Sequence, residues 1–428
     1  MDSLDILFLG KAPCGEKQSV KKYISRGVII TMLEFLLWTV IILILAGACL
    51  LSYALRMRQM HLWIGEYIRR SIERKPKTGS EPIHIFVAVA DHFEPAWQRP
   101  TYEQECARVE TWVRRYPVMA AKHLDADGRC PQHTFFYPEE EYRPEHLDKL
   151  AQLCKAGCGD VEIHLHHDHD TAEGLREKLL RFKMTLHERH GLLHRHAQTG
   201  EVEYGFIHGN WALDNARKDG RWCGVNNELI VLRETGCYAD FTLPSAPSGT
   251  QTRKINSIYY AVDDPLGPKS HNTGVEVEVG KAPAGDLMII QGPLALNWAS
   301  RKWGVLPRIE NAELSSENPP TPERVDRWIQ QHIHVKGQPH WIFVKLHTHG
   351  AQEQNFEALL GQPMEAMLSY LETAYNDGQR YRLHYVTARE MYALIRAAES
   401  DMGESLVNLL GSDSPKLASS QKTRIDSL

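Results

Sequence analysis

The chain has 428 residues and a formal net charge of −5, from 49 Lys and Arg against 54 Asp and Glu. Hydrophobic residues make up 43% and charged residues 24%, which excludes a disordered, collagen-like or low-complexity chain because there is enough apolar matter for a large core. The negative net charge argues against a nucleic-acid-binding protein, which would need a basic surface. Of the 22 histidines, eight lie between His164 and His196.

The first predicted element is an uncharged apolar run from Phe35 to Leu55. At about 1.5 Å of rise per residue, such a helix spans a hydrocarbon core of roughly 30 Å. We expect a single transmembrane anchor over residues 28–55, because the run is too long and begins too late for a cleaved signal peptide. More basic residues follow the run than precede it, which favours a cytoplasmic carboxyl-terminal domain. If the chain starts at Met32 rather than Met1, this preference strengthens.

Composition divides the remaining chain into further segments. Residues 1–27 are polar. Residues 56–81 are basic and amphipathic, which predicts a juxtamembrane helix followed by a linker. Residues 82–399 are predicted to form one globular domain, and the Ser-rich tail 400–428 is expected to be disordered.

Strand and helix patterns alternate through residues 82–399 and predict a parallel α/β barrel of seven or eight strands, closed or nearly closed. The predicted strands are Ile83–Ala90, His133–Tyr137, Val161–Leu165, Tyr204–Ile207, Cys237–Thr242, Asp286–Ile290, Trp341–Lys345 and Arg382–Val386. The predicted helices are Thr101–His123, Pro144–Ala156, Ala172–His190, Asn226–Thr235, Glu323–His334 and Met364–Asn376. In such a barrel, ligands bind at the carboxyl ends of the strands.

Histidines and carboxylates, with one asparagine and one tryptophan, gather at the ends of five predicted strands. They are Asp91, His92 and Glu94; His164, His166, His167, Asp168 and Asp170; His208, Asn210 and Trp211; Asp240; and His347 and His349. Imidazole with carboxylate is the ligand set of a borderline divalent ion such as zinc, cobalt or nickel. We therefore expect a metal site at this edge, because burying so many ionisable groups without partners is too costly.

Two other patterns favour structural roles. The acidic run Glu139–Glu141 follows a predicted strand and is interpreted as a solvated loop. Among the eight cysteines, Cys154 and Cys158 form the one close pair, and no second pair completes a zinc site of familiar spacing. We expect the cysteines to be structural thiols.

The order of these motifs resembles that of the polysaccharide deacetylase superfamily, the NodB-like carbohydrate esterases. The resemblance covers residues 82–390 and rests on Val89–His92, Thr134–Phe136, Glu162–Asp170 and Val344–His347. It implies a metal-dependent hydrolase that removes acetyl groups from an N-acetylated polysaccharide or lipid-linked glycan. By the same resemblance, Asp91 is similar to a general base and His347 to the general acid for the leaving amine.

The resemblance also implies a ligand set, with zinc first and cobalt or nickel as alternatives. His166 matches the first metal-binding histidine of the family. Asp170 stands where the family has its second histidine, and His92 where it has an aspartate. His164 is an additional imidazole on the same strand face as His166, because strand side chains alternate. The implied ion is held by His166, Asp170 and one of His92 or His164.

Other residues depart from the family pattern and are expected to contact the site or the sugar. The family's Arg-Pro-Pro-Tyr loop is replaced by Ile207–Trp211, and Trp211 is suited to stack on a pyranose face. The remaining expected contacts are Glu94, His167, Asp168, His208, Asn210, Asp240 and His349. The resemblance further implies a bacterial inner-membrane setting, with a glycan substrate and other polysaccharide-assembly proteins as partners.

Two alternatives remain open. The His164-Leu165-His166 pair is also typical of amidohydrolase-like and PHP-like metal hydrolases, although in those proteins the pair usually lies on the first strand. The departures from the family pattern are compatible with an inactive protein that binds or assembles glycans. Metal content discriminates the second alternative, because a binding module has no need for a stoichiometric transition metal.

Overall fold

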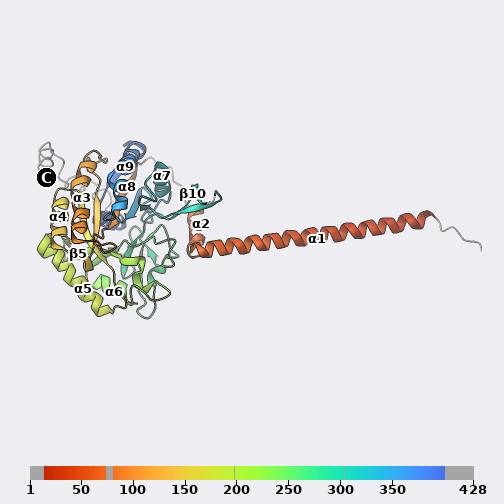
Figure 1. Ribbon diagram of the computed structural model, residues 1–428, viewed down its shortest axis with the longest axis horizontal. Coiled ribbons are helices and arrows are strands. Elements are labelled where there is room, and N and C mark those ends of the chain that lie inside the picture. Colours follow the sequence, from red (N-terminus) through yellow and green to blue (C-terminus); the bar gives the residue numbers. More distant parts are fainter. Residues whose placement is uncertain (1–13, 74–80, 197, 303, 401–428) are drawn as a thin grey trace, which may run out of the picture. The chain divides into compact units, whose positions relative to one another are not determined.

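The computed structural model describes residues 14–73, 81–196, 198–302 and 304–400 (Figure 1). The chain divides into two units, Met1–His61 and Leu62–Leu428, and each is described by itself. The expected disordered tail lies outside the described residues from residue 401 onward, as do the start of the polar segment and residues 74–80 of the predicted linker.

The first unit contains one long helix, α1 (Cys14–Met57), which is labelled in Figure 1. Its part Ile29–Met57 is long and apolar enough to cross a membrane, since 29 residues of helix extend for about 43 Å. None of its most apolar stretch is buried within the protein. By length and composition this helix fits a membrane span or a signal sequence.

The second unit is built on one 12-stranded sheet and a separate two-stranded hairpin. Along its main path the large sheet has the order β12-β13-β1-β2-β3-β5-β6-β9-β7-β8, while β14 pairs with β1 and β4 pairs with β5. The strands are β1 (Ile83–His92), β2 (His133–Pro138), β3 (Gly159–Leu165), β4 (His194–Arg195), β5 (Val202–His208), β6 (Cys237–Asp240), β7 (Ile258–Ala261), β8 (Val275–Glu276), β9 (Leu287–Ile290), β10 (Ala295–Lys302), β11 (Leu306–Glu310), β12 (Glu313–Leu314), β13 (Trp341–Thr348) and β14 (Tyr381–Tyr385).

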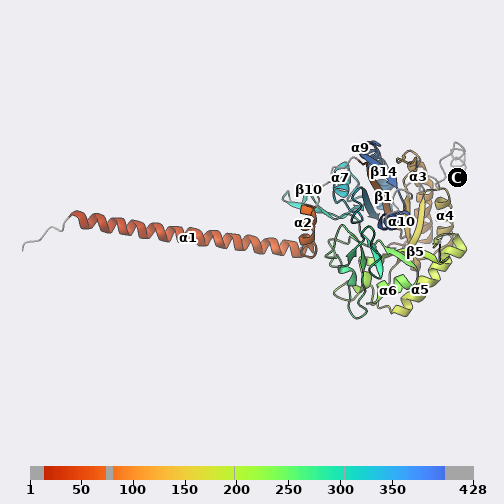
Figure 2. The ribbon, with the colours of Figure 1, turned by 180° about the vertical axis from the view of Figure 1, so that it is seen from behind.

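Helices cover both faces of this sheet, and α3 and α4 lie side by side in both views (Figures 1 and 2). The helices of the second unit are α2 (Ile64–Glu73), α3 (Tyr102–Ala120), α4 (Pro144–Lys155), α5 (Ala172–Met184), α6 (Glu228–Glu234), α7 (Pro322–Gln330), α8 (Phe356–Leu360), α9 (Gln362–Ala374) and α10 (Ala388–Glu399). Helix α3 begins at a capping box, in which the Thr101 side chain accepts from the Gln104 N–H and Gln104 reaches back to the Thr101 N–H.

The prediction of a closed or nearly closed barrel is wrong. The sheet is open, because its path ends at β12 on one side and β8 on the other, and no pairing joins these two strands within the described residues. Strand β6 meets β9 through a single parallel bridge. The next strand, β7, then runs antiparallel to both β9 and β8. The sheet is therefore mixed: neighbours on its main path from β12 to β9 are parallel, as are β14 and β1, while β7, β8 and β4 pair antiparallel.

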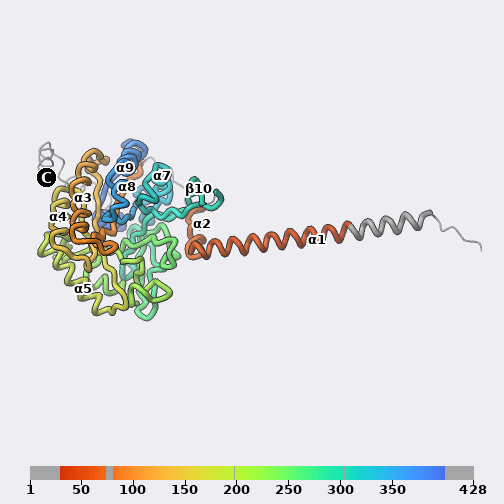
Figure 3. Tube along the Cα trace, viewed as in Figure 1, coloured from red at the N-terminus to blue at the C-terminus, as the bar shows by residue number. Residues whose placement is uncertain are grey.

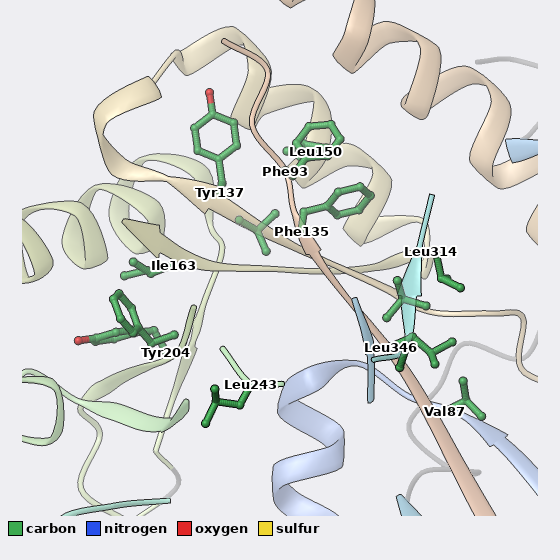
Figure 4. Close-up of a cluster of buried hydrophobic side chains, with 14 of the residues drawn as sticks. Val87, Phe93, Phe135, Tyr137, Leu150, Ile163, Tyr204, Leu243, Leu314 and Leu346 are labelled. Carbon is green, nitrogen blue, oxygen red and sulfur yellow. The ribbon is translucent and has the colours of Figure 1, made fainter. Parts of the chain in front are cut away.

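The alternation of side chains along β1 gives the sheet two buried faces. Ile85, Val87 and Val89 belong to a large apolar cluster that includes residues of α3, α4 and α5. Phe86, Ala88 and Ala90 belong to a second cluster, which α10 helps to form. Figure 4 shows members of the first cluster from β1, β2, β3, β5, β12 and β13 gathered on one side of the sheet. This double burial explains why apolar residues on β1 occupy consecutive positions from Ile85 to Ala90.

The last two strands of the second unit, β13 and β14, both pair with its first strand, β1. Strand β13 pairs in parallel with β1 from His84–Trp341 to Asp91–Thr348, and β14 pairs with the amino-terminal half of β1. Figure 3 follows this return by colour, from the orange segments near the start of the second unit to the blue segments near its end. Because β13, β1, β2, β3 and β5 are parallel neighbours, their carboxyl ends meet at one edge.

Candidate metal centre

The carboxyl ends of β1, β3 and β13 carry histidines into the same region. His92 is the last residue of β1, His164 lies near the end of β3, and His347 lies near the end of β13. All three side chains are buried. The sequence prediction that polar residues gather at this edge is thus reflected in the arrangement of the strands.

Glu94, two residues after β1, lies between two imidazoles. Its Oε1 atom is 3.1 Å from Nε2 of His164 and 3.4 Å from Nε2 of His166. One ligand atom from each of these three residues lies within 4.8 Å of the other two. Glu94 and His164 are buried, while the His166 side chain is 30% exposed, so the group is reachable from solvent on the His166 side. Two imidazoles and one carboxylate form the protein ligand set of many catalytic zinc sites.

The outer nitrogens of both imidazoles face oxygen atoms. Nδ1 of His164 is 2.9 Å from the carbonyl oxygen of Ile207, and Nδ1 of His166 is 2.5 Å from Oε1 of Glu140. Without an ion, Nε2–H of each ring faces the Glu94 carboxylate; with an ion bound, Nδ1 would carry the proton and donate outward while Nε2 faced the ion. Metal-binding histidines in proteins are oriented by this kind of contact.

A second group of three donors shares Glu94. It consists of His92, Glu94 and His349, again with ligand atoms within 4.8 Å of one another. The His92 and His349 rings are stacked with centroids 4.8 Å apart, and His92 lies 4.9 Å from the His164 ring. The Nε2 atom of His92 is buried without a hydrogen-bond partner. An unpaired buried nitrogen at this position fits a site built to hold a cation.

Burial and contact set the protonation of these groups. Burial raises the pKa of Glu94, but the hydrogen bonds from His164 and His166 outweigh it and hold this pKa well below the usual value. For His166, burial lowers the pKa, and the contacts with Glu140 and Glu94 overcome it and raise the pKa to about 10. Burial, followed by the neighbouring His349 and His164, lowers the pKa of His92 well below its usual value. Burial does the same to the pKa of His347.

The structure surrounds Asp91 with other groups. Because side chains alternate along β1, Asp91 and His92 point to opposite faces of the sheet. Asp91 Oδ1 accepts a 2.5 Å hydrogen bond from the N–H of Gly350, and Oδ2 lies 2.8 Å from Nε2 of His133. Asp91 is fully buried, so both of its oxygens are occupied by protein groups. Its role as a general base stays a prediction.

Asp170 also has other partners. Its Oδ2 accepts a 2.6 Å hydrogen bond from Nζ of Lys178 and lies 3.2 Å from Nδ1 of His167. Its neighbour Asp168 is half exposed and accepts a hydrogen bond from the N–H of Trp222. The carboxylate beside His166 in the three-donor group is that of Glu94. The predicted ligand Asp170 contacts His167 instead.

The remaining predicted residues are divided between two regions. His167 and His208 belong to a separate cluster, in which both contact Glu228. Asp240, at the end of β6, accepts from the N–H and hydroxyl of Thr242, and burial raises its pKa to about 7. The Trp211 ring lies 6.1 Å from that of His92 and 6.0 Å from that of His349, so Trp211 belongs to the candidate centre.

The loop after β5 has an unusual backbone. Asn210 and Trp211 have φ angles of 55° and 53°, in the left-handed region that residues other than glycine rarely adopt. Such conformations cost free energy and occur most often at functional sites. Here they lie in a short helical turn, Gly209–Trp211, directly after His208.

Sequence reasoning missed Glu140, which was interpreted as part of a solvated loop. The side chain contacts Nδ1 of His166 although it is 35% exposed. Its position was nevertheless a usable signal, because Glu140 follows β2, and β2 lies between β1 and β3 in the sheet. A carboxylate directly after β2 therefore lies at the same edge of the sheet as the carboxyl ends of β1 and β3.

Comparison of the chain with protein-family models and with curated proteins finds no match. The fold and the side-chain geometry are therefore the basis for any statement on function.

Proposed function

We propose that this chain is a metal-dependent hydrolase that removes acetyl groups from an N-acetylated glycan. The observation that carries the proposal is the position of Glu94 between His164 and His166, with the outer nitrogens of both rings facing oxygen atoms. His164, His166 and Glu94 would hold the ion, with His92 and His349 beside them. When bound, a divalent ion such as zinc polarises a carbonyl group and makes water more acidic.

The chain's own residues would position the substrate and move protons. The Trp211 ring borders the cluster and offers an apolar face to a sugar ring. His349 is half buried and lies near both Trp211 and His92, where it is suited to exchange a proton with the leaving amine. His347 is buried and neutral at neutral pH, so it would accept a proton before it could donate one.

The helix Ile29–Met57 would anchor this hydrolase in a membrane. We propose a single-pass topology in a bacterial inner membrane, with the hydrolase unit on the cytoplasmic side by the charges that flank the helix. Glycan-assembly proteins on the same membrane would be its partners. Protease protection of the second unit in sealed vesicles tests the side.

The test uses full-length protein in detergent. We expect stoichiometric zinc, cobalt or nickel and release of acetate from N-acetylated oligosaccharides. His164→Ala and Glu94→Gln should each lose the activity and the metal of this centre. His169→Asn is the matched control, because His169 belongs to the same histidine run but is 81% exposed, and asparagine tolerates its φ of 52°.

Activity on phosphoesters or cyclic amides in place of N-acetylated sugars would contradict the deacetylase proposal and favour another metal hydrolase. Absence of metal at this centre, even after reconstitution, would contradict a hydrolytic role and favour a glycan-binding protein.

A further inference from the structure

A second cluster of four metal-binding side chains lies beside the candidate metal centre. It consists of His167, His208, Cys223 and Glu228, which offer ligand atoms within 4.8 Å of one another. All four residues are buried. Consecutive residues contribute to the two clusters: His166 contacts Glu94 in the first, and His167 contacts Glu228 in the second.

The distances in this cluster match those between ligands that share one ion. Glu228 Oε1 lies 3.1 Å from Nε2 of His167 and 3.5 Å from Nε2 of His208. The other oxygen, Oε2, is 3.4 Å from Sγ of Cys223. Bonds of about 2.0–2.3 Å in a tetrahedral zinc site place neighbouring ligand atoms roughly 3.3–3.7 Å apart. The contacts made by Glu228 are therefore close to those in a zinc site, and all four ligand atoms lie within 4.8 Å of one another.

The Nε2 atom of His208 provides an independent indication. It is buried and has no hydrogen-bond partner, and it faces the Glu228 carboxylate. The opposite nitrogen, Nδ1, lies 2.5 Å from the carbonyl oxygen of Gly209. Nδ1 of His167 lies 3.2 Å from Asp170 Oδ2 but makes no hydrogen bond. Both imidazoles thus have an outer oxygen neighbour and an inward Nε2, as metal-bound histidines do.

The sulfur of Cys223 contacts two backbone donors, although burial and the neighbouring Glu228 raise the pKa of its thiol. The backbone N–H groups of Asn215 and Val225 point to Sγ at 3.3 and 3.4 Å. Such donors stabilise a negatively charged sulfur. The cysteine loop is tied to the histidine loop, because the N–H of Asp170 donates to the carbonyl oxygen of Cys223. At Gly224, with φ +100°, a Cβ atom would lie within 3.0 Å of the Asp170 backbone, so only glycine allows this approach.

We propose that His167, His208, Cys223 and Glu228 bind one zinc ion in a closed, four-ligand structural site. The complete burial of all four side chains leaves no ligand position open to substrate, which is typical of structural rather than catalytic zinc. Binding replaces the thiol proton of Cys223, which is released to solvent, and uses the neutral form of both histidines. This site is separate from the hydrolytic centre of the proposed function.

The test is substitution of cobalt(II) for the metals of the full-length protein in detergent. Cobalt bound to a thiolate shows a charge-transfer absorption in the near ultraviolet that nitrogen and oxygen ligands do not give. We expect this band in the wild type and its loss in Cys223→Ser, together with a fall from two metal ions per chain to one. Cys237→Ser is the control, because Cys237 is equally buried and its sulfur contacts the carbonyl oxygen of Ala239.

The proposal is overturned if the wild type lacks the band or if Cys223→Ser keeps it. If Cys223→Ser does not fold, X-ray absorption of the zinc-loaded wild type decides, since the proposal requires one sulfur neighbour at about 2.3 Å. His164→Ala separates the two sites, because it should remove the ion of the hydrolytic centre and leave the charge-transfer band unchanged. A wild type with the band but without hydrolysis would therefore reject the proposed function alone.

Discussion

The Nδ1 atom of His166 lies 2.5 Å from Oε1 of Glu140, and this contact fixes the ring with its other nitrogen toward Glu94. Glu140→Gln should therefore weaken metal binding at the candidate metal centre by about 10- to 100-fold without removing a ligand. Competition with a chromophoric chelator measures the change. Glu139→Gln is the control, because Glu139 binds Arg181 at the surface. Equal affinity in the Glu140 variant and the wild type would reject the orienting role.

Asp91→Asn tests whether Asp91 is a general base or a positioning residue. Asparagine can keep the hydrogen bond from Gly350 and donate to His133, so we expect kcat/KM to fall by less than about tenfold, the size of one weakened hydrogen bond. A general base would give a loss of about 10²–10⁴-fold with the pH profile altered. Such a loss, with metal content and thermal stability unchanged, would establish the role that the family resemblance implies.

Trp211→Ala tests the proposed sugar platform. Loss of the ring should raise KM for an N-acetylated oligosaccharide by roughly three- to tenfold, as expected for one aromatic contact, and leave kcat close to that of the wild type. Steady-state kinetics with oligosaccharides of increasing length measure this. Trp298→Ala, in the exposed hairpin strand β10, should have no effect. A fall in kcat alone would place Trp211 in the chemistry instead.

Glu162 on β3 should make the stability of the second unit depend on pH. Burial raises the pKa of Glu162 from 4.5 to about 8, although the side chain accepts hydrogen bonds from the Tyr238 hydroxyl and the Gly205 N–H. The folded protein thus holds a proton that the unfolded chain releases above pH 4.5. Stability from this group is present below pH 4.5 and is lost as the pH rises to about 8.

The loss should amount to a few kcal/mol of unfolding free energy. Glu162→Gln should remove this pH dependence and raise the melting temperature at pH 8 relative to the wild type. Thermal unfolding from pH 4 to pH 9 measures both effects. Glu201→Gln, at an exposed position, should leave the curve unchanged. A parallel curve for Glu162→Gln and the wild type would contradict the prediction.

The sequence predicted those strands that are buried on both faces. Ile83–His92 and Trp341–Thr348 are largely apolar segments, and such segments indicate a buried strand locally. Whether the sheet closes could not be predicted from the sequence, because closure depends on whether the two outermost strands pair with each other. The two-residue strands β8 and β12 and the antiparallel β7 have no pattern strong enough to predict their pairing.

Prediction of the site was limited in the same way. Strand ends correctly indicated that His92, Glu94 and His164 would be neighbours, since the carboxyl ends of parallel strands share an edge. The family resemblance implied that Asp170 joins His166, but Lys178 on α5 and the nearby His167 contact that carboxylate instead. Cys223 had no sequence signal, because its neighbours in the cluster come from separate segments and no second cysteine accompanies it.

The open sheet ends in very short strands, and this has a consequence for how copies of the protein meet. Strands β12 and β8 each contain two residues, and β8 carries Glu276, which forms ion pairs with Arg70 and Lys254. A long, flat outer strand would offer free backbone groups on which another molecule could add a strand. Two-residue strands flanked by charge offer very few. Copies of the protein crowded together on one surface should therefore not aggregate through the edges of this open sheet. A closed barrel avoids the same hazard because it has no edge strands.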